Sequence, residues 1–388
     1  MIVLLFIIAA VHAQLASAHL HKLTTASIAF SQKLYQRVAA TEPNIVYSPY
    51  SIHSALTMML LGARGDTAAE LRKTLRVTSF GRSLHPTYSE LISEINSVTE
   101  VELKTADAIF VNPYFLVAPH FIQDTYFYYR ALTVNIELQA TGGPEKQVND
   151  FIAGRTRNII QDVLSPGSID SNTAMILINT IYFNGTWEQT FNEGRTELED
   201  FNKLDGTLRK VEMMKTDRLV NIKRDKVNKM DVAQLPYKGG RFSLYFVLPH
   251  AQDGITEIER RLARPKQVKQ LFTGLNKTYI LLAIPRFKTE TTLSLTAPLQ
   301  DMGILKAFDR NGANFSGMTS SPVYLSQVLH KAVIEVKEKE TVAAAATVQI
   351  KLLVSAVPLE RFIADHPFLY FLRDNQTGQI LFQWKFSG

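Results

Sequence analysis

A nearly continuous apolar run extends from Met175 to Phe183, with the polar residues Asn179 and Thr180 at its centre. Successive side chains of a strand point to opposite faces of a sheet, so a strand that is apolar on both faces is covered on both. The run therefore predicts a central strand of a sheet.

Helical patterns dominate the chain before this strand. Ser48 offers a capping hydroxyl ahead of Pro49, and apolar residues then recur at helical spacing from Ile52 to Leu60. Thr67 with Glu70 predicts a capping box that opens a short helix through Leu75. Further helical patterns occupy Tyr88 to Val98, His120 to Tyr129 and Glu145 to Val163.

Strand patterns dominate after Met175. They occupy Phe242 to Leu248, Tyr279 to Ile284, Val328 to Val336 and Phe368 to Leu372, and a turn at Gly378 pairs the last with Ile380 to Phe386. Helices come first and strands later, without βαβα alternation and without an internal repeat. This order predicts one mixed α+β domain.

The amino-terminal segment differs from the rest of the chain. Ile2 to Val11 is uninterrupted apolar sequence, and small-x-small patterns end at Ala13 and Ala18. The run is too short to span a bilayer, as is every later segment. Residues 1–18 are therefore predicted to be a signal peptide cleaved after Ala13 or Ala18, residues 19–388 to be the folded domain, and the protein to be secreted without a membrane anchor.

Two compositional features bear on an exported protein. Cysteine is absent, which excludes disulfides, thiolate metal sites and a cysteine nucleophile. Candidate N-glycosylation triplets begin at Asn184, Asn276, Asn314 and Asn375.

Catalytic and nucleic-acid motifs are missing. The chain has no Gly-x-Ser-x-Gly elbow, no His-Glu-x-x-His, no phosphate-binding glycine loop and no paired-histidine metal spacing. We therefore expect no enzyme, no metal and no cofactor; a triad assembled from distant residues, as in an unrelated hydrolase, is the alternative. Basic clusters at Arg209 to Lys229 and Arg260 to Lys269 suit glycosaminoglycan binding, but ordinary solvated faces are the favoured interpretation, and nothing indicates nucleic acid.

The stretch from Glu338 to Thr347 has an unusual composition. A strand rich in β-branched residues runs directly into four alanines, Ala343 to Ala346, although alanine favours helices over strands. Composition alone favours a short helix or a low-complexity linker.

This stretch resembles the hinge of the serpin family. His366-Pro-Phe-Leu-Tyr-Phe371, preceded by Ala364-Asp365, is similar to the family's carboxy-terminal signature. Other segments between about residues 28 and 386 match in the same order, namely Asn44-Ile-Val-Tyr-Ser48-Pro-Tyr-Ser51, Asn179-Thr-Ile-Tyr-Phe183-Asn-Gly-Thr-Trp187, Ile284-Pro-Arg-Phe287-Lys and Phe315-Ser-Gly-Met318.

The resemblance implies a single domain of three β-sheets and about nine helices with an exposed reactive-centre loop at about residues 338–358. A target protease cuts this loop, which then inserts as a new strand into the central sheet and carries the acyl-enzyme with it. The implied function is a secreted suicide inhibitor, monomeric by itself, that forms a covalent complex with an extracellular serine protease.

The hinge residues suit insertion into a covered sheet. Thr341, Ala343, Ala345 and Thr347 would share one face, and all are small and uncharged. Two residues depart from the family hinge, because glycine usually stands where Glu340 is and glutamate where Val342 is. A non-inhibitory serpin acting as carrier, chaperone or storage protein is therefore the alternative. The complete hinge comprises Glu338, Glu340, Thr341, Val342, Ala343, Ala344, Ala345, Ala346 and Thr347.

The resemblance also assigns the cut bond. In the family it usually follows the residue sixteen positions beyond the first hinge glutamate, which places it at Val354-Ser355 when counted from Glu338. A small branched side chain suits the shallow pocket of an elastase-like protease. Leu353 with a chymotrypsin-like target and Lys351 with a trypsin-like target are the alternatives.

The family's sheet-locking residues complete the implied site. Ser48, Ser51, Asn179 and His330 correspond to the shutter, which holds the central sheet closed, and Trp187 to the breach where the loop enters. His330 is in register with Val328, Ala332 and Ile334, which predicts that it points inward. Without the resemblance, His330 and Trp187 are interpreted as ordinary core residues.

Overall fold

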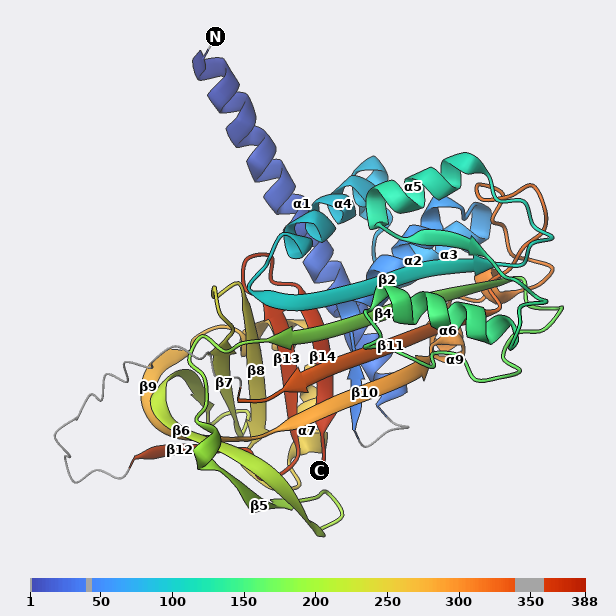
Figure 1. Ribbon diagram of the computed structural model, residues 1–388. Coiled ribbons are helices and arrows are strands. Elements are labelled where there is room, and N and C mark those ends of the chain that lie inside the picture. Colours follow the sequence, from blue (N-terminus) through green and yellow to red (C-terminus); the bar gives the residue numbers. More distant parts are fainter. Residues whose placement is uncertain (1, 40–43, 339–358) are drawn as a thin grey trace.

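The computed structural model describes residues 2–39, 44–338 and 359–388 (Figure 1). The described residues form nine α-helices, fourteen strands and four short 3-10 helices. The α-helices are α1 (Ile2–Val38), α2 (Pro49–Met58), α3 (Gly65–Thr74), α4 (Leu84–Asn96), α5 (Pro119–Tyr129), α6 (Pro144–Arg155), α7 (Ile255–Leu262), α8 (Pro265–Leu271) and α9 (Thr296–Asp301).

The strands form two hydrogen-bonded sheets. The five-stranded sheet has the order β10-β11-β4-β2-β3. Its strands are β2 (Val101–Val111), β3 (Leu132–Asn135), β4 (Met175–Gly185), β10 (Phe287–Ser294) and β11 (Gln327–Val336).

The nine-stranded sheet has the order β1-β14-β13-β8-β7-β6-β9-β12, and β5 pairs with β6 outside this path. Its strands are β1 (Ile45–Tyr47), β5 (Thr196–Asn202), β6 (Leu208–Asp225), β7 (Met230–Pro236), β8 (Phe242–Pro249), β9 (Asn276–Pro285), β12 (Glu360–Ile363), β13 (Phe368–Asp374) and β14 (Ile380–Phe386). The 18-residue β6 pairs with β5 and β9 and, at its end, with β7. It thereby joins into one hydrogen-bonded ladder strands that the predicted three-sheet arrangement divides between two sheets.

Strand β4 lies at the centre of the smaller sheet, and all its residues are buried. Helix α6 crosses one face (Figure 1), where Val148 and Ile152 share a core with Ile176 and Ile178. The opposite face of β4 contributes Leu177 and Ile181 to the main core, which also contains Ile52 and Leu56 of α2. The predicted two-sided strand is confirmed, because helices cover both faces.

Most predicted elements are present, but the start of α3 differs from the prediction. The predicted capping box is wrong, because α3 already begins at Gly65, where φ is 51°. The Thr67 hydroxyl instead accepts the backbone N–H of Asn314 at 2.9 Å, and the Glu70 carboxylate accepts the backbone N–H groups of Leu305 and Lys306 at 2.7 Å. These side chains hold a distant loop rather than their own helix.

Helix α6 is shorter than predicted, and two strands lie in the segment that the sequence assigns mainly to helix. α6 ends at Arg155, because Arg157 and Asn158 adopt positive φ values of 53° and 59°. The strands are β2 and β3; β2 pairs with β4 along its whole length. Its sequence alternates only weakly, so its strand character depends on this partner.

Helix α1 is continuous from Ile2 to Val38. Within the described ranges, we find no helix that is both long enough and apolar enough to cross a membrane.

Candidate functional site

The predicted loop joins two different sheets. It follows β11 of the smaller sheet and precedes β12, which pairs in parallel with β9 of the larger sheet. Of the predicted hinge, Glu338 is described. The remaining hinge residues and the candidate cut bonds lie outside the described residues, namely Glu340, Thr341, Val342, Ala343, Ala344, Ala345, Ala346, Thr347, Lys351, Leu353, Val354 and Ser355.

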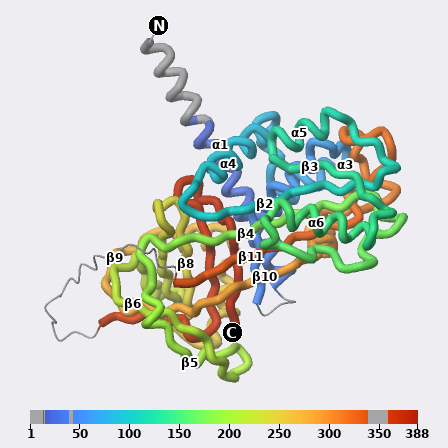
Figure 2. The backbone as a smooth tube through the Cα atoms, viewed as in Figure 1, coloured from blue at the N-terminus to red at the C-terminus, as the bar shows by residue number. Residues whose placement is uncertain are grey.

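The smaller sheet is closed at the position where a loop would insert. β11 and β4 are direct parallel neighbours, paired from Gln327↔Ile176 to Glu335↔Asn184. They run side by side through the middle of the molecule (Figure 2). A strand that entered between them would have to break this ladder and replace it with two new ones.

The four predicted shutter residues meet at the middle of this ladder. His330 is paired with Asn179 in the strand register, and its Nδ1 lies 2.6 Å from the Asn179 Oδ1. The other ring nitrogen, Nε2, accepts the backbone N–H of Ser48 at 3.0 Å. Asn179 Nδ2 donates to the Ser51 hydroxyl, and Ser48 Oγ caps α2 by accepting the Ser51 N–H at 3.1 Å. Helix α2 is thus bound to both strands, and His330 is fully buried as predicted.

Asp107 is a fifth member of this cluster that the sequence interpretation missed. It lies on β2 opposite Asn179 and accepts a hydrogen bond from the Asn179 Nδ2. Its local signal is a single acid between Ala106 and Ala108 in an otherwise apolar strand segment. The network therefore crosses three adjacent strands and one helix.

The environment changes the protonation of two cluster members. Burial raises the pKa of the Asp107 carboxyl to about 7, although the hydrogen bond from Asn179 opposes this shift. Burial also lowers the pKa of His330 to about 3. His330 is therefore neutral at physiological pH, which suits a ring nitrogen that accepts the Ser48 N–H.

These shifts predict a pH-dependent effect of Asp107→Asn. In the folded wild type the carboxyl holds its proton up to about pH 7, whereas an unfolded aspartate loses it near pH 4. The stability that Asp107 contributes is complete below pH 4 and is lost as the pH rises through 7. Asparagine does not ionise, so it does not lose this contribution. The melting temperature of D107N, measured relative to that of wild type, should therefore rise between pH 4 and 8. Thermal unfolding of both proteins at intervals across this range tests it; an offset that does not change with pH would contradict it.

A second cluster surrounds the end of β11. Trp187 is buried and stacks on Tyr237 with ring centroids 4.3 Å apart, and its Nε1 donates to the Lys337 carbonyl at 2.9 Å. The Glu338 carboxylate accepts from the Thr196 hydroxyl at 2.6 Å and lies 3.6 Å from Arg286. Trp187 thus contacts Lys337, the residue before the predicted loop. Sequence reasoning did not find the roles of Thr196, Tyr237 and Arg286.

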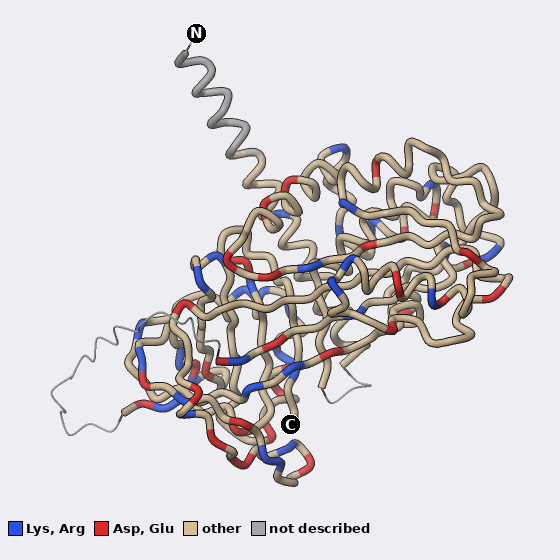
Figure 3. Tube along the Cα trace, viewed as in Figure 1, with Lys and Arg blue, Asp and Glu red and all other residues tan. Residues whose placement is uncertain are grey.

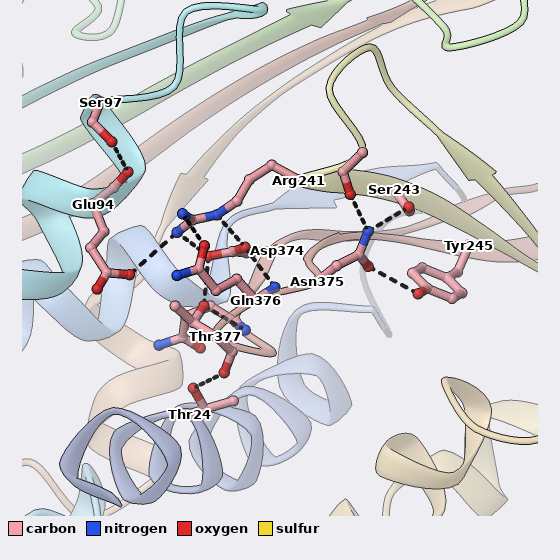
Figure 4. Close-up of polar contacts among 12 residues, drawn as sticks. Thr24, Glu94, Ser97, Arg241, Ser243, Tyr245, Asp374, Asn375, Gln376 and Thr377 are labelled. Carbon is pink, nitrogen blue, oxygen red and sulfur yellow. Dashed lines mark hydrogen bonds and ion pairs between the residues drawn. The ribbon is translucent and has the colours of Figure 1, made fainter. Parts of the chain in front are cut away.

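The four glycosylation triplets have different environments. Asn276 and Asn314 are exposed, whereas Asn184 is buried within β4. The side chain of Asn375 is engaged on both ends (Figure 4): its Nδ2 donates to the Ser243 hydroxyl at 2.8 Å, and its Oδ1 accepts from the Tyr245 hydroxyl at 3.0 Å. Asn276 and Asn314 are therefore the accessible acceptors in the folded domain.

The basic clusters are partly neutralised by neighbouring acids. Blue and red residues are interspersed along the trace in Figure 3. In the first cluster Lys215 contacts Glu197 and Glu199, and Arg224 contacts Asp231. In the second cluster Arg260 and Arg261 both bind Glu257. These pairs are typical of solvated faces. Searching the described ranges also reveals no group of three His, Asp or Glu side chains placed to hold a metal ion.

Comparison with known proteins places this geometry in a family. The family model for serpins, described as serine protease inhibitors, matches residues 25–387. The chain is 33% identical to human Serpin B3, covering 95% of this chain and 100% of that protein, and 32% identical to human leukocyte elastase inhibitor with the same coverage. The crystal structure of uncleaved ovalbumin superposes with a TM-score of 0.86 at 27% identity, covering 95% of this chain and 100% of that one. The chain therefore belongs to the serpin family.

Proposed function

We propose that this serpin inhibits a serine protease by offering Val354-Ser355 as bait and inserting the cut loop between β4 and β11. The observation that carries this proposal is the closed β4–β11 ladder, locked at its middle by Asn179 and His330. A sheet locked by reversible hydrogen bonds at the place of insertion suits a domain that must open there once.

The target is proposed to be elastase-like. Val354 is a small branched residue that fits a shallow pocket, and a relative at 32% identity is named leukocyte elastase inhibitor. Chymotrypsin-like cleavage after Leu353 is the second choice and trypsin-like cleavage after Lys351 the third.

A protease panel tests both the mechanism and the bond. We expect the purified protein to form a complex with neutrophil elastase that survives denaturing gels, with chymotrypsin and trypsin as comparisons. Mass spectrometry of the released carboxy-terminal peptide identifies the bond, because the peptide begins at Ser355, Val354 or Leu352 for cleavage after Val354, Leu353 or Lys351. Cleavage by all three proteases without any stable complex would refute inhibition.

The carrier, chaperone or storage alternative is favoured by the hinge departures at Glu340 and Val342. Thermal unfolding of the intact and the loop-cleaved protein separates the two functions. An inserting serpin gains a strand in its central sheet on cleavage, so its melting temperature should rise sharply. A non-inserting carrier should unfold at the same temperature before and after cleavage.

Secretion is proposed from the first eighteen residues. Within α1 the side chains of Gln14, Ser17 and Ala18 are exposed, whereas Leu20 and Leu23 are buried in the core. The change from exposed to buried falls close to the predicted cleavage sites. Amino-terminal sequencing of protein from a secreting cell line should therefore begin at Gln14 or His19. The secreted inhibitor is further proposed to be monomeric and to carry glycans at Asn276 and Asn314.

A glycosaminoglycan is proposed only as a weak partner, because the ion pairs described above offset part of the positive charge of both basic clusters. Elution from a heparin column below physiological salt is expected, and tight retention at that salt concentration would revive this partner.

A further inference from the structure

A cavity of about 220 Å³ lies at the edge of the smaller sheet. β3 pairs with β2 only from Ala108 to Val111, so the preceding part of β2 has no strand partner on that side within the described part of the chain. Residues 103–107 of β2 form one wall of the cavity. The other walls come from the ends of α4, α5 and α6, through Asn96, Tyr129, Arg130 and Arg155.

Three basic side chains line this cavity, namely Lys104, Arg130 and Arg155. Arg130 and Arg155 lie about 6 Å from the centroids of Tyr126 and Phe151 on their own helices (5.9 and 6.0 Å). Throughout the described ranges, none of the three has an ion-pair or hydrogen-bond partner. This contrasts with the basic residues of the two clusters above, many of which pair with an acid.

Helix dipoles do not account for these unused donors. Each helix end that borders the cavity carries the equivalent of about half a negative charge, which attracts basic residues to this place. However, no helix carbonyl accepts a hydrogen bond from the three side chains in the described structure. The Asp107 carboxylate, the acid in the lining, is instead bonded to Asn179 on β4. The guanidinium and ammonium groups therefore remain free to bind a ligand.

We propose that this cavity binds a small oxyanion of the phosphate or sulfate type. Two guanidinium groups and an ammonium group present the donors that such a group requires, and arginine in particular binds oxyanions through two parallel hydrogen bonds. The volume lies below the range of about 300–1,000 Å³ typical of sites for drug-sized ligands, which limits the occupant to a compact one. Oxyanion binding here does not require the proposed loop insertion. A failure of the inhibitory proposal would therefore leave this proposal unaffected.

Isothermal titration of the intact protein with sodium phosphate tests the site, with sodium chloride at equal ionic strength as the blank. Saturable phosphate binding is expected in the wild type. The double variant R130Q/R155Q should weaken it at least tenfold, and K104Q alone should weaken it by a smaller factor. At pH 8, where the Asp107 carboxyl is ionised, D107N should tighten it, because a negative charge at the wall is removed. The matched control is R209Q/K266Q, which removes two exposed charges elsewhere and should bind phosphate as wild type does.

Three results would overturn the proposal: no saturable binding beyond the chloride blank, equal affinity in R130Q/R155Q and wild type, or equal loss in the pocket and control variants. Variants that unfold near the wild-type temperature without phosphate exclude a folding defect, and the exposed Arg130 and Arg155 make such a defect unexpected. Competition with a sulfated heparin tetrasaccharide identifies the source. Displacement of phosphate assigns the site to a sulfated polymer, and no displacement assigns it to a free anion. Either result supports an oxyanion site in this cavity.

Discussion

Thr341→Arg should convert the protein from an inhibitor into a substrate of its target protease. The substitution places a charge on the face shared by Thr341, Ala343, Ala345 and Thr347, which would be buried when the loop enters between β4 and β11. An unpaired buried charge costs several kcal/mol, and about 1.4 kcal/mol slows a step tenfold. Insertion should therefore be slowed by more than about a hundredfold. Hydrolysis of the acyl-enzyme should then be faster than insertion and release the protease.

Denaturing gels and stoichiometry measure this outcome. The stable complex should disappear from T341R while the loop is still cut, and many moles of protein should be consumed per mole of protease. Val342→Arg is the matched control, because it adds the same charge at the adjacent position on the opposite face of the strand. If T341R and V342R lost inhibition equally, the assigned register would be wrong.

Of the substitutions proposed for this protein, Asn179→Ala should cause the largest loss of folding stability. The side chain bonds to His330, Ser51 and Asp107, and its removal leaves buried polar groups on β11, α2 and β2 without their partner. Each such group costs about 1–3 kcal/mol, so with three groups unpaired the free energy of unfolding should fall by at least about 3 kcal/mol. Because the same bonds lock β4 to β11, the closed sheet should also open more readily.

Urea unfolding gives the free energy, and native gels after mild heating show whether opened molecules form oligomers by strand addition. Asn311→Ala, in an exposed loop, is the control and should change stability by less than about 0.5 kcal/mol. An N179A protein as stable as N311A would show that the cluster does not lock the sheet.

Local sequence patterns located most elements because their causes are local. The cap at Ser48, the apolar run at Met175 and the turn at Gly378 each combine neighbouring residues whose conformational preferences agree. The same reasoning failed at Thr67 and Glu70, where a valid capping pattern is used instead to hold residue 314 and residues 305 and 306, respectively. It also missed β2, because a weakly alternating segment becomes a strand only beside β4.

The candidate site likewise has parts that local sequence predicts and parts that it does not. Residue spacing alone predicts which hinge positions would share a strand face, since this depends only on chain geometry. The bait at Val354 is instead what the serpin resemblance implies, through the family's usual count from Glu338. Recognition of the shutter residues required resemblance to a family, because no local pattern distinguishes His330 from an ordinary core histidine. The resemblance did not identify Asp107.

The sequence by itself therefore determined the two-sided central strand and the α+β organisation, because alternation and composition act over a few residues; the register of the hinge stays a prediction. Only the tertiary structure decided that β4 and β11 close directly on each other and that Ser48, Ser51, Asp107, Asn179 and His330 form one network. The bonding partners of Asn179 stand 72, 128 and 151 residues away in the chain. Contacts of that range exist only once the sheet has assembled.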